Sequence, residues 1–217
     1  MKIRECGESM LLVELEQVID PIVNERAIEL AARIRARRAR GVRDVAPGYC
    51  TVGVHFDPLQ TDLAALERAI EAEFGAIESI SAVADRRVIE IPVRYGGADG
   101  PDLGLVAEFA GCAPGDVIGR HIARTYRVYM LGFVPGFCYM GRVESSIAAP
   151  RHRVPRERVP AGSVGIAGGQ TGVYPVESPG GWQLIGRTDT VMFDANRARP
   201  SLLAPGDLVR FVAVSQA

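Results

Sequence analysis

Residues 160–188 read PAGSVGIAGGQTGVYPVESPGGWQLIGRT, and this stretch limits the kind of sheet that the second part of the chain can form. Its apolar runs are too short for helices, and glycine or proline separates them. Many short strands with turn residues between them are typical of a β-barrel or a β-sandwich. Such runs lie at Tyr126–Phe133, Val159–Ala167, Gly172–Val176, Trp182–Thr188, Thr190–Phe193 and Leu208–Val214. Two short helices are expected before most of them, at Pro101–Ala110 and at Pro114–His121.

The first part of the chain has a different pattern, since only five of the 24 glycines lie within residues 1–90. One helix is expected after Asp20-Pro21, where an N-cap residue precedes a proline, and a second from Thr61-Asp62 to Gly75. Strands are expected at Met10–Leu15, Tyr49–Phe56, Ile77–Val83 and Arg87–Val93. These short strands and two helices indicate a small sheet with two helices on one face. We therefore predict two domains, residues 1–87 and residues 88–217.

Charge and composition exclude several classes of protein. The chain has 217 residues, a formal net charge of −1 and an isoelectric point near 6.3. Binding to nucleic acid or to an acidic membrane through bulk positive charge is therefore not expected. No apolar run approaches the ~20 residues that span a bilayer. Glutamates near the N-terminus occupy the place where a signal peptide needs an apolar stretch. We expect a cytoplasmic protein without a nucleic-acid or membrane partner.

Residues that hold metals and phosphates in common motifs are scarce. Four cysteines stand far apart without a Cys-x-x-Cys pair, which argues against zinc ribbons and thioredoxin-like sites. His55, His121 and His152 also stand alone, so no metal site is expected. Lys2 is the only lysine among 25 basic residues, whereas a Walker A loop and a Schiff base both require one. Arginine, backbone N–H groups and neutral polar side chains are left to bind any phosphate or carboxylate.

Several candidate site residues precede the glycine-rich stretch. Phe133 and Phe137 flank a Pro-Gly turn, and they either pack in the core or form the lip of an aromatic pocket. His121 comes at the expected end of a helix and is either structural or a proton carrier. Arg151 and Arg156 lie in a segment stiffened by prolines, where they either face solvent or bind an anion.

Further candidates lie within the glycine-rich stretch. A turn presents Gln170 and Thr171, followed by Tyr174, and such amide and hydroxyl groups suit an amide-bearing ligand. Gln183 and Arg187 lie on the strand that follows the only tryptophan, and we expect them to join Gln170 in a polar cluster. In the alternative interpretation, this strand belongs to a plain hairpin with the tryptophan in the core.

Taken in order, the segments 126–137, 160–175 and 177–188 resemble the 5-oxoprolinase B-subunit family, also called the allophanate hydrolase subunit 1 or KipI family. Strong motifs extend from about residue 120 to 190, and the first 90 residues match mainly in length and in the order of elements. One departure is Cys138, where the family usually has proline. The resemblance implies an α+β fold, with an N-terminal two-layer α/β domain and a C-terminal cyclophilin-like β-barrel.

The resemblance also implies an activity. Members of the family act with 5-oxoprolinase subunits A and C to hydrolyse 5-oxo-L-proline to L-glutamate with ATP, and alone this chain is expected to be inactive. ATP with Mg²⁺ is expected in a site shared with the partner subunit. Two alternatives remain open. One is a KipI-type inhibitor of a sensor histidine kinase, and the other is the carboxyltransferase lobe of a biotin-dependent urea carboxylase or allophanate hydrolase system.

Specific roles follow from the family motif positions. Phosphorylation of the lactam oxygen would turn a poor electrophile into one with a good leaving group, and this step requires positive charge. We predict a catalytic role for His121, Gln170 and Arg187, with His121 moving a proton. Substrate binding is predicted for a larger set: Phe133, Phe137, Arg151, Arg156, Thr171, Tyr174 and Gln183.

Overall fold

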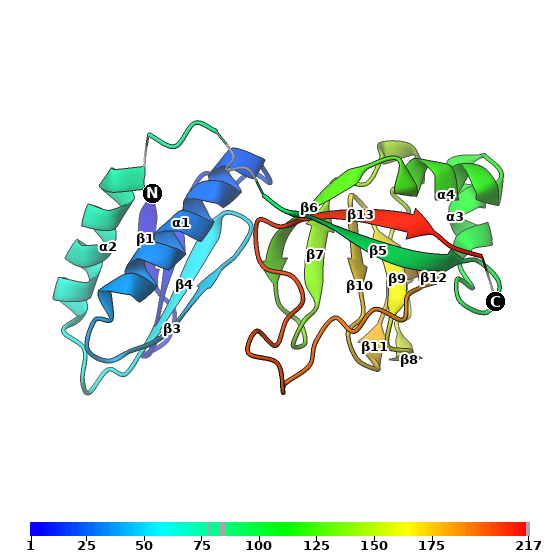
Figure 1. Ribbon diagram of the computed structural model, residues 1–217. Coiled ribbons are helices and arrows are strands. Elements are labelled where there is room, and N and C mark those ends of the chain that lie inside the picture. The colour runs from blue at the N-terminus through cyan, green and yellow to red at the C-terminus, as the bar shows by residue number, and fades with distance from the viewer. Residues whose placement is uncertain (78, 83–85, 216–217) are drawn as a thin grey trace. The chain divides into compact units, whose positions relative to one another are not determined.

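The computed structural model describes residues 1–77, 79–82 and 86–215 (Figure 1). The chain divides into two compact units, Met1–Asp85 and Arg86–Ala217. Each unit has its own hydrophobic core. Among the described residues, no helix combines the length and the apolar character needed to cross a bilayer. The fold class is α+β, which confirms the prediction from sequence.

The first unit is an antiparallel sheet with two helices. Its strands pair in the order β1-β2-β4-β3. Alternate residues of the central strands are buried on one face of the sheet, and both helices contribute to the same core. The elements are β1 (Lys2–Glu5), β2 (Met10–Glu14), α1 (Pro21–Arg37), β3 (Val42–Pro47), β4 (Thr51–Phe56) and α2 (Leu63–Ile77).

The two helices of this unit show which local signals were reliable. Asp20 caps α1 as predicted, because its carboxylate accepts the backbone N–H groups of Ile22 and Val23. The prediction that Gly75 ends α2 is wrong, since the helix continues to Ile77. Ile77 is fully buried, and its burial offsets the ~1 kcal/mol that glycine costs inside a helix. The strand predicted at 77–83 is also wrong over residues 77 and 79–82, whereas residues 78 and 83 lie outside the described part.

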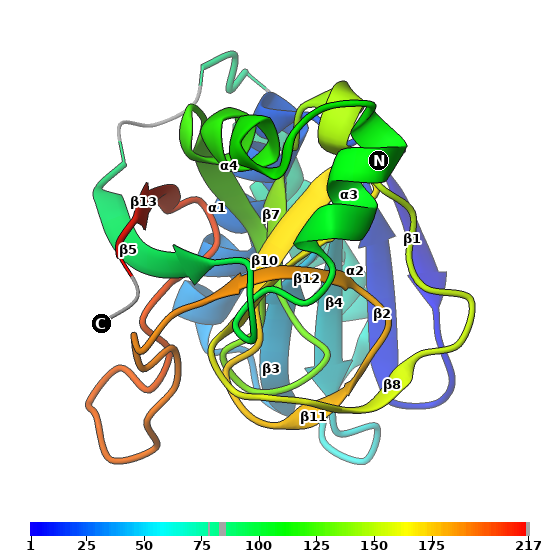
Figure 2. The same cartoon turned by 90° about the vertical axis from the view of Figure 1, so that its right-hand side faces the viewer.

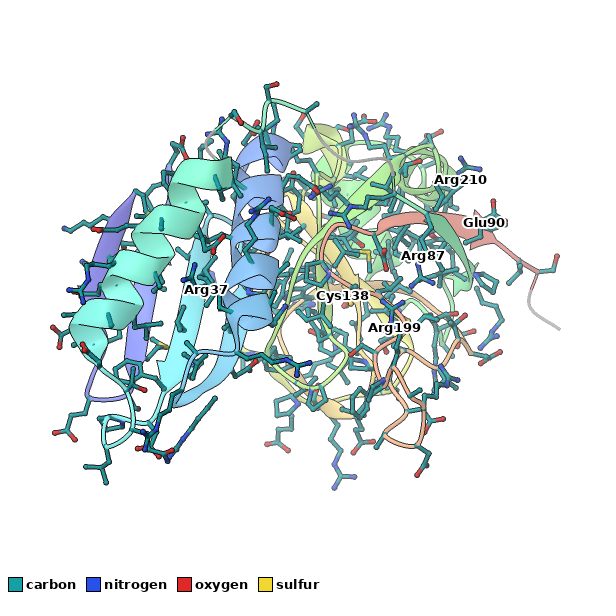
Figure 3. All side chains as sticks on the ribbon, turned by 60° about the vertical axis from the view of Figure 1, so that its left-hand side comes forward. Arg37, Arg87, Glu90, Cys138, Arg199 and Arg210 are labelled. Atoms are coloured by element: carbon teal, nitrogen blue, oxygen red, sulfur yellow. The ribbon has the colours of Figure 1, made fainter. Side chains whose placement is uncertain are left out.

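The second unit contains a closed barrel, whose strands follow the order β10-β7-β6-β13-β5-β12-β9 in the described part of the chain. Its neighbouring strands are antiparallel except β13 and β5, which run parallel. Arg210 of β13 stands opposite Glu90 of β5, and their side chains form an ion pair of 3.4 Å (Figure 3). The barrel strands are β5 (Val88–Tyr95), β6 (Thr125–Leu131), β7 (Cys138–Gly141), β9 (Ser163–Ala167), β10 (Gln170–Val173), β12 (Gln183–Arg187) and β13 (Leu208–Ala213).

Smaller elements cover two sides of the barrel. Helices α3 (Leu103–Ala110) and α4 (Pro114–Ile122) lie on one side, with the short 3-10 helix Ser145–Ile147 (Figure 2). On the opposite side, β8 (Arg156–Val159) and β11 (Ser178–Gly180) form a separate two-stranded sheet. The run predicted as one strand at 159–167 is therefore split between β8 and β9. The run predicted at 190–193 forms no strand and contributes only one isolated bridge, from Phe193 to Ser201.

The second unit buries two apolar clusters. The larger one fills the barrel and includes Tyr126 and Phe211. The smaller one is mainly aromatic and joins the barrel to the β8–β11 sheet: Phe137, Val159, Ala167, Tyr174, Trp182 and Leu184. This aromatic cluster forms the base of the site described next.

Candidate functional site

An open pocket of about 270 Å³ lies over the aromatic cluster of the second unit. Most of its wall comes from three stretches of chain: the loop before β7, the segment before β8, and β11 with the two residues after it. Tyr139 of β7 and Tyr174, just after β10, complete it. Pockets that take small molecules are usually apolar with a few polar groups, and this lining has that character. The lining residues are Phe133, Phe137, Tyr139, Arg151, Pro155, Tyr174, Pro179, Gly180, Gly181 and Trp182.

Phe137 holds the aromatic walls in place. Its ring makes edge-to-face contacts with Tyr139, Tyr174 and Trp182, at centroid distances of 4.9, 5.2 and 5.3 Å. Phe133 stands at the mouth with 59% of its surface exposed, and its φ of 70° is rare for an aromatic residue. Backbone conformations of this kind are often found at functional sites. Phe137 therefore packs in the core and lines the pocket, while Phe133 forms the lip.

Arg151 is the one charged side chain in this lining. Its guanidinium carbon lies 5.8 Å from the centre of the Trp182 ring, which is a cation–π geometry. The pocket thus combines flat apolar walls with a single forked donor at its edge. This arrangement can bind a small ligand that has an apolar ring and one carboxylate.

A buried carboxylate supports the wall that carries Arg151. Asp102, at the start of α3, is only 2% exposed. Its Oδ1 accepts a hydrogen bond from Arg156 Nη2 at 2.6 Å. Its Oδ2 accepts from the backbone N–H of Leu184 at 2.7 Å and from His152 Nε2 at 3.1 Å. One carboxylate therefore joins α3, β12 and the 151–156 segment.

Burial alone would raise the pKa of Asp102, but its hydrogen bonds outweigh that effect. The bonds from Arg156, from the Leu184 N–H and from His152 favour the charged form, so the pKa is held below its usual value. A pKa that is lower in the folded chain means that the ionised carboxylate stabilises the fold above about pH 4. That contribution is lost as the pH falls through the folded-state value.

His121 lies in the barrel interior and is fully buried. Thr171 Oγ1 donates to the carbonyl of Gly165, so it accepts the proton of His121 Nε2 at 3.0 Å. The Tyr95 hydroxyl then donates to His121 Nδ1 at 2.8 Å. The neutral imidazole has both nitrogens satisfied, and its ring stacks on Phe211 at 4.7 Å. Burial lowers the pKa of His121 to about 3.

The buried His121 should make the fold sensitive to mild acid. The unfolded chain binds a proton near pH 6.5 and the folded chain does not, so stability is full above that pH and falls below it. Between pH 7.5 and 5.5 we expect a loss of about 1.4 kcal/mol, measured by urea unfolding. His121→Gln should remove this slope, and His55→Gln, at an exposed position, should keep it. Equal slopes in both variants would contradict the assignment.

Comparison with known proteins places this geometry in a family. Residues 1–203 match the sequence model of the carboxyltransferase domain, subdomain C and D. The 5-oxoprolinase B-subunit of Bacillus subtilis is 40% identical, over 99% of this chain and 93% of that protein. The corresponding protein of Escherichia coli O157:H7 is 44% identical, over 95% of this chain and 93% of that protein. The chain belongs to the 5-oxoprolinase B-subunit family.

Solved structures agree with this family assignment. The crystal structure of TTHA0988 is 37% identical with a TM-score of 0.84, and the match covers all of this chain but only 41% of the longer one. The Kluyveromyces lactis urea amidolyase is 23% identical with a TM-score of 0.78, over 98% of this chain and 15% of that protein, and shows a shared fold. The fold of the 5-oxoprolinase B-subunit thus occurs as part of longer chains.

Some of the site residues predicted from the sequence line the pocket, and others lie outside it. Phe133, Phe137, Arg151 and Tyr174 line the pocket. Arg156 lies beside it and pairs with Asp102. The remaining predicted residues are outside the lining.

Thr171 and His121 contact each other inside the barrel, as described above, and both are fully buried. Gln170 pairs with Ala167 at one end of β9, whereas Arg187 pairs with Ser163 at the other end. The structure therefore does not bring Gln170 and Arg187 together in the expected polar cluster. Gln183 is buried and donates from Nε2 to the carbonyl of Pro150. The catalytic roles given to these residues stay predictions.

The sequence interpretation missed Asp102, which it placed simply at the start of an expected helix. A single aspartate before an apolar helix normally indicates a cap, but this side chain makes no cap hydrogen bond. Its partners lie 50 to 82 residues away, so no local pattern identifies them. Cys138, the departure from the family motif, lies in the core (Figure 3), and burial raises the pKa of its thiol to about 12. Its thiol therefore stays protonated and is a poor nucleophile at neutral pH.

Proposed function

We propose that this chain is the B-subunit of an ATP-dependent 5-oxoprolinase, which hydrolyses 5-oxo-L-proline to L-glutamate together with subunits A and C. The match to two proteins of that name over nearly their whole length supports the family activity. The observation that carries the proposal in the structure is the aromatic pocket with one guanidinium at its edge.

The substrate has the chemistry that this pocket suits. 5-Oxo-L-proline is a five-membered lactam with two ring methylenes, one amide and one carboxylate. The methylene face of the ring would pack against Phe137 and Trp182, and the carboxylate would accept the forked donors of Arg151. A volume of about 270 Å³ lies just below the ~300–1,000 Å³ usual for pockets of drug-sized ligands, which suits so small a molecule.

Arg151 supplies the positive charge in this scheme. Arg156 is paired with a buried carboxylate, so its charge is already balanced inside the protein. Arg187 donates from Nε to the carbonyl of Ala161, away from the pocket lining. Of Arg151, Arg156 and Arg187, Arg151 is the one that lines the pocket.

ATP and Mg²⁺ are assigned to a site completed by the partner. ATP supplies the phosphoryl group that activates the lactam oxygen. The described residues contain no group of three or more His, Cys, Asp or Glu side chains that could hold a metal ion. Mg²⁺ usually binds through one or two carboxylates together with the phosphates of the nucleotide, so it would enter this shared site with ATP. The longer chain of TTHA0988, of which this fold covers 41%, supports a second polypeptide beside this one.

Reconstitution tests the proposed function. This chain, co-expressed with candidate subunits A and C, should form L-glutamate from 5-oxo-L-proline only when ATP is present. Each subunit omitted in turn should reduce turnover to background. Because Trp182 is the only tryptophan, a fluorescence titration with 5-oxo-L-proline should also report binding to this chain alone. Turnover that continues without this chain would overturn the proposal.

A carboxyltransferase role is the second candidate, because the matching family model carries that name. The urea amidolyase of Lachancea kluyveri is 26% identical over 98% of this chain but only 13% of that protein. This role requires a biotin-dependent partner, and a carboxylation assay with such a partner would separate it from 5-oxoprolinase activity. Inhibition of a histidine kinase, a cytoplasmic location and inactivity of the lone subunit stay predictions from the sequence.

A further inference from the structure

Arg151 lies on a short segment that belongs to no helix or strand. Residues 149–155, the strap, connect the short helix Ser145–Ile147 to β8 and form no strand. Arg151 is exposed, and both it and Pro155 line the pocket. Loop residues of this kind hold a fixed position only when other groups tie the backbone down.

Five hydrogen bonds tie the strap and Arg156 to distant parts of the unit, besides the β8–β11 pairing. Before Arg151, the carbonyl of Ala149 accepts the backbone N–H of Gly168 at 2.8 Å, and the carbonyl of Pro150 accepts from Gln183 Nε2 at 2.9 Å. The backbone N–H of His152 donates to the carbonyl of Gly181 at 2.7 Å. The side chains of His152 and Arg156 both bond to Asp102, at 3.1 and 2.6 Å. The two side-chain anchors that follow Arg151 both end on a single carboxylate. They lie on either side of Pro155, and Arg151 directly precedes the first of them.

The Asp102 carboxylate is fixed from the opposite side by the barrel. It accepts the backbone N–H of Leu184 on β12, while the backbone N–H of Asp102 donates to the carbonyl of Leu184 at 2.9 Å. Leu184 belongs to the aromatic cluster and lies two residues after Trp182 in the sequence. Asp102 therefore connects the ring under Arg151 to the strap that carries Arg151.

Arg156 depends strongly on this carboxylate. Its Nη1 is buried without a hydrogen-bond partner, so the pair with Asp102 is its main compensation. A buried guanidinium that loses its counter-charge is strongly unfavourable, and the side chain would have to move toward water. Movement of Arg156 would displace β8 and the strap before it.

We propose that Asp102 is a positioning residue, which holds the strap so that the guanidinium of Arg151 stands over Trp182 at the pocket. The inference rests on the proposed function for its ligand, 5-oxo-L-proline. The quenching of Trp182 fluorescence, which reports the position of the strap, does not depend on that function. Asp102 does not touch the proposed substrate. It acts by keeping Arg151 in place before the substrate arrives, which reduces the cost of ordering the strap on binding.

Asp102→Asn is the sharpest variant, because all three groups facing the side chain are donors. An amide of the same shape would turn an NH₂ group toward at least one of these donors and would remove the charge opposite Arg156. The matched control is Asp99→Asn, three residues away, whose carboxylate pairs with Arg94 and not with the strap. His152→Ala removes only one anchor and serves as a milder second variant, should Asp102→Asn fail to fold.

Two measurements test the proposal on the full chain. Acrylamide quenching of Trp182 fluorescence reports whether the strap still covers the ring, and 5-oxo-L-proline titration reports affinity. We expect steeper quenching in Asp102→Asn and an apparent Kd raised about tenfold, if the held strap is populated about a tenth of the time. In the reconstituted complex, KM should rise while kcat stays close to that of the wild type. Asp99→Asn should match the wild type in each case.

The outcomes separate this proposal from the proposed function. A folded Asp102→Asn variant with wild-type quenching, Kd and KM would overturn the positioning role. Equal losses in kcat and in the fraction folded, without a change in KM, would also overturn it, because they indicate a purely structural role. If the wild-type chain does not bind 5-oxo-L-proline, the proposed function fails, while the quenching comparison still decides the role of Asp102.

Discussion

Arg151→Ala is expected to lower kcat/KM of the reconstituted complex for 5-oxo-L-proline about 30-fold, or ~2 kcal/mol. The substitution removes the one charged side chain of the pocket lining and leaves the substrate carboxylate against apolar rings. A hydrogen bond to a charged group contributes about 1.5–3 kcal/mol, which sets the size of the effect. Steady-state kinetics and Trp182 fluorescence titration measure it, and Kd should rise with KM.

Arg153→Ala is the matched control for this experiment. Arg153 is an exposed arginine of the same strap, two residues further on, and it is absent from the pocket lining. It should leave kcat/KM within about twofold of the wild type, as expected for an exposed charge away from the site. Arg151→Lys should lower kcat/KM by an intermediate amount, since lysine keeps the positive charge but lacks the paired donors of a guanidinium. Wild-type kinetics in Arg151→Ala would exclude this pocket as the carboxylate site.

Gly100→Ala is expected to destabilise the protein by about 3 kcal/mol, at the upper end of the range for overpacking. A Cβ atom at this position would lie 2.1 Å from the carbonyl oxygen of Ile185 and 2.3 Å from its carbon. Both are backbone atoms of β12, so the clash is not relieved by rotating a side chain. The turn that contains Gly100 leads directly into Asp102, so any shift should also loosen the strap.

Urea unfolding measures the loss in free energy of unfolding of Gly100→Ala, and Gly104→Ala provides the control. Gly104 is an exposed residue of α3, and a Cβ atom added there would meet no heavy atom within 4 Å. Alanine there should stabilise the helix by up to ~1 kcal/mol. If Gly100→Ala unfolds at the same urea concentration as the wild type, the close approach of this turn to β12 is wrong.

Local sequence signals predicted the presence of helices and strands better than the residues at which they begin and end. The Asp20-Pro21 start of α1 and its buried stripe follow from capping and 3.6-residue spacing, which depend on neighbours in sequence. The end of α2 did not follow, because burial of Ile77 against distant strands outweighs the local preference of Gly75. Short apolar runs separated by glycine and proline correctly indicated many β-strands, while their closure into a barrel depends on pairings that no local pattern contains.

The site was predictable to the extent that it is built from adjacent residues. Phe133, Phe137 and Arg151 were recognisable as an aromatic lip and a donor near prolines. The expected cluster of Gln170 with Arg187 failed, because strand register separates them along β9. Asp102 was missed for a related reason, since its role depends on contacts across the fold.

The parallel pairing of β13 with β5 has a consequence for biosynthesis. The strand Leu208–Ala213 lies between β5 and β6, so neither of these earlier strands has its full complement of neighbours until the chain has been made that far. A ribosome-bound chain that stops before Leu208 would present two unpaired strand edges, which favour aggregation. A chain truncated before Leu208 is therefore expected to aggregate more readily than the full-length chain.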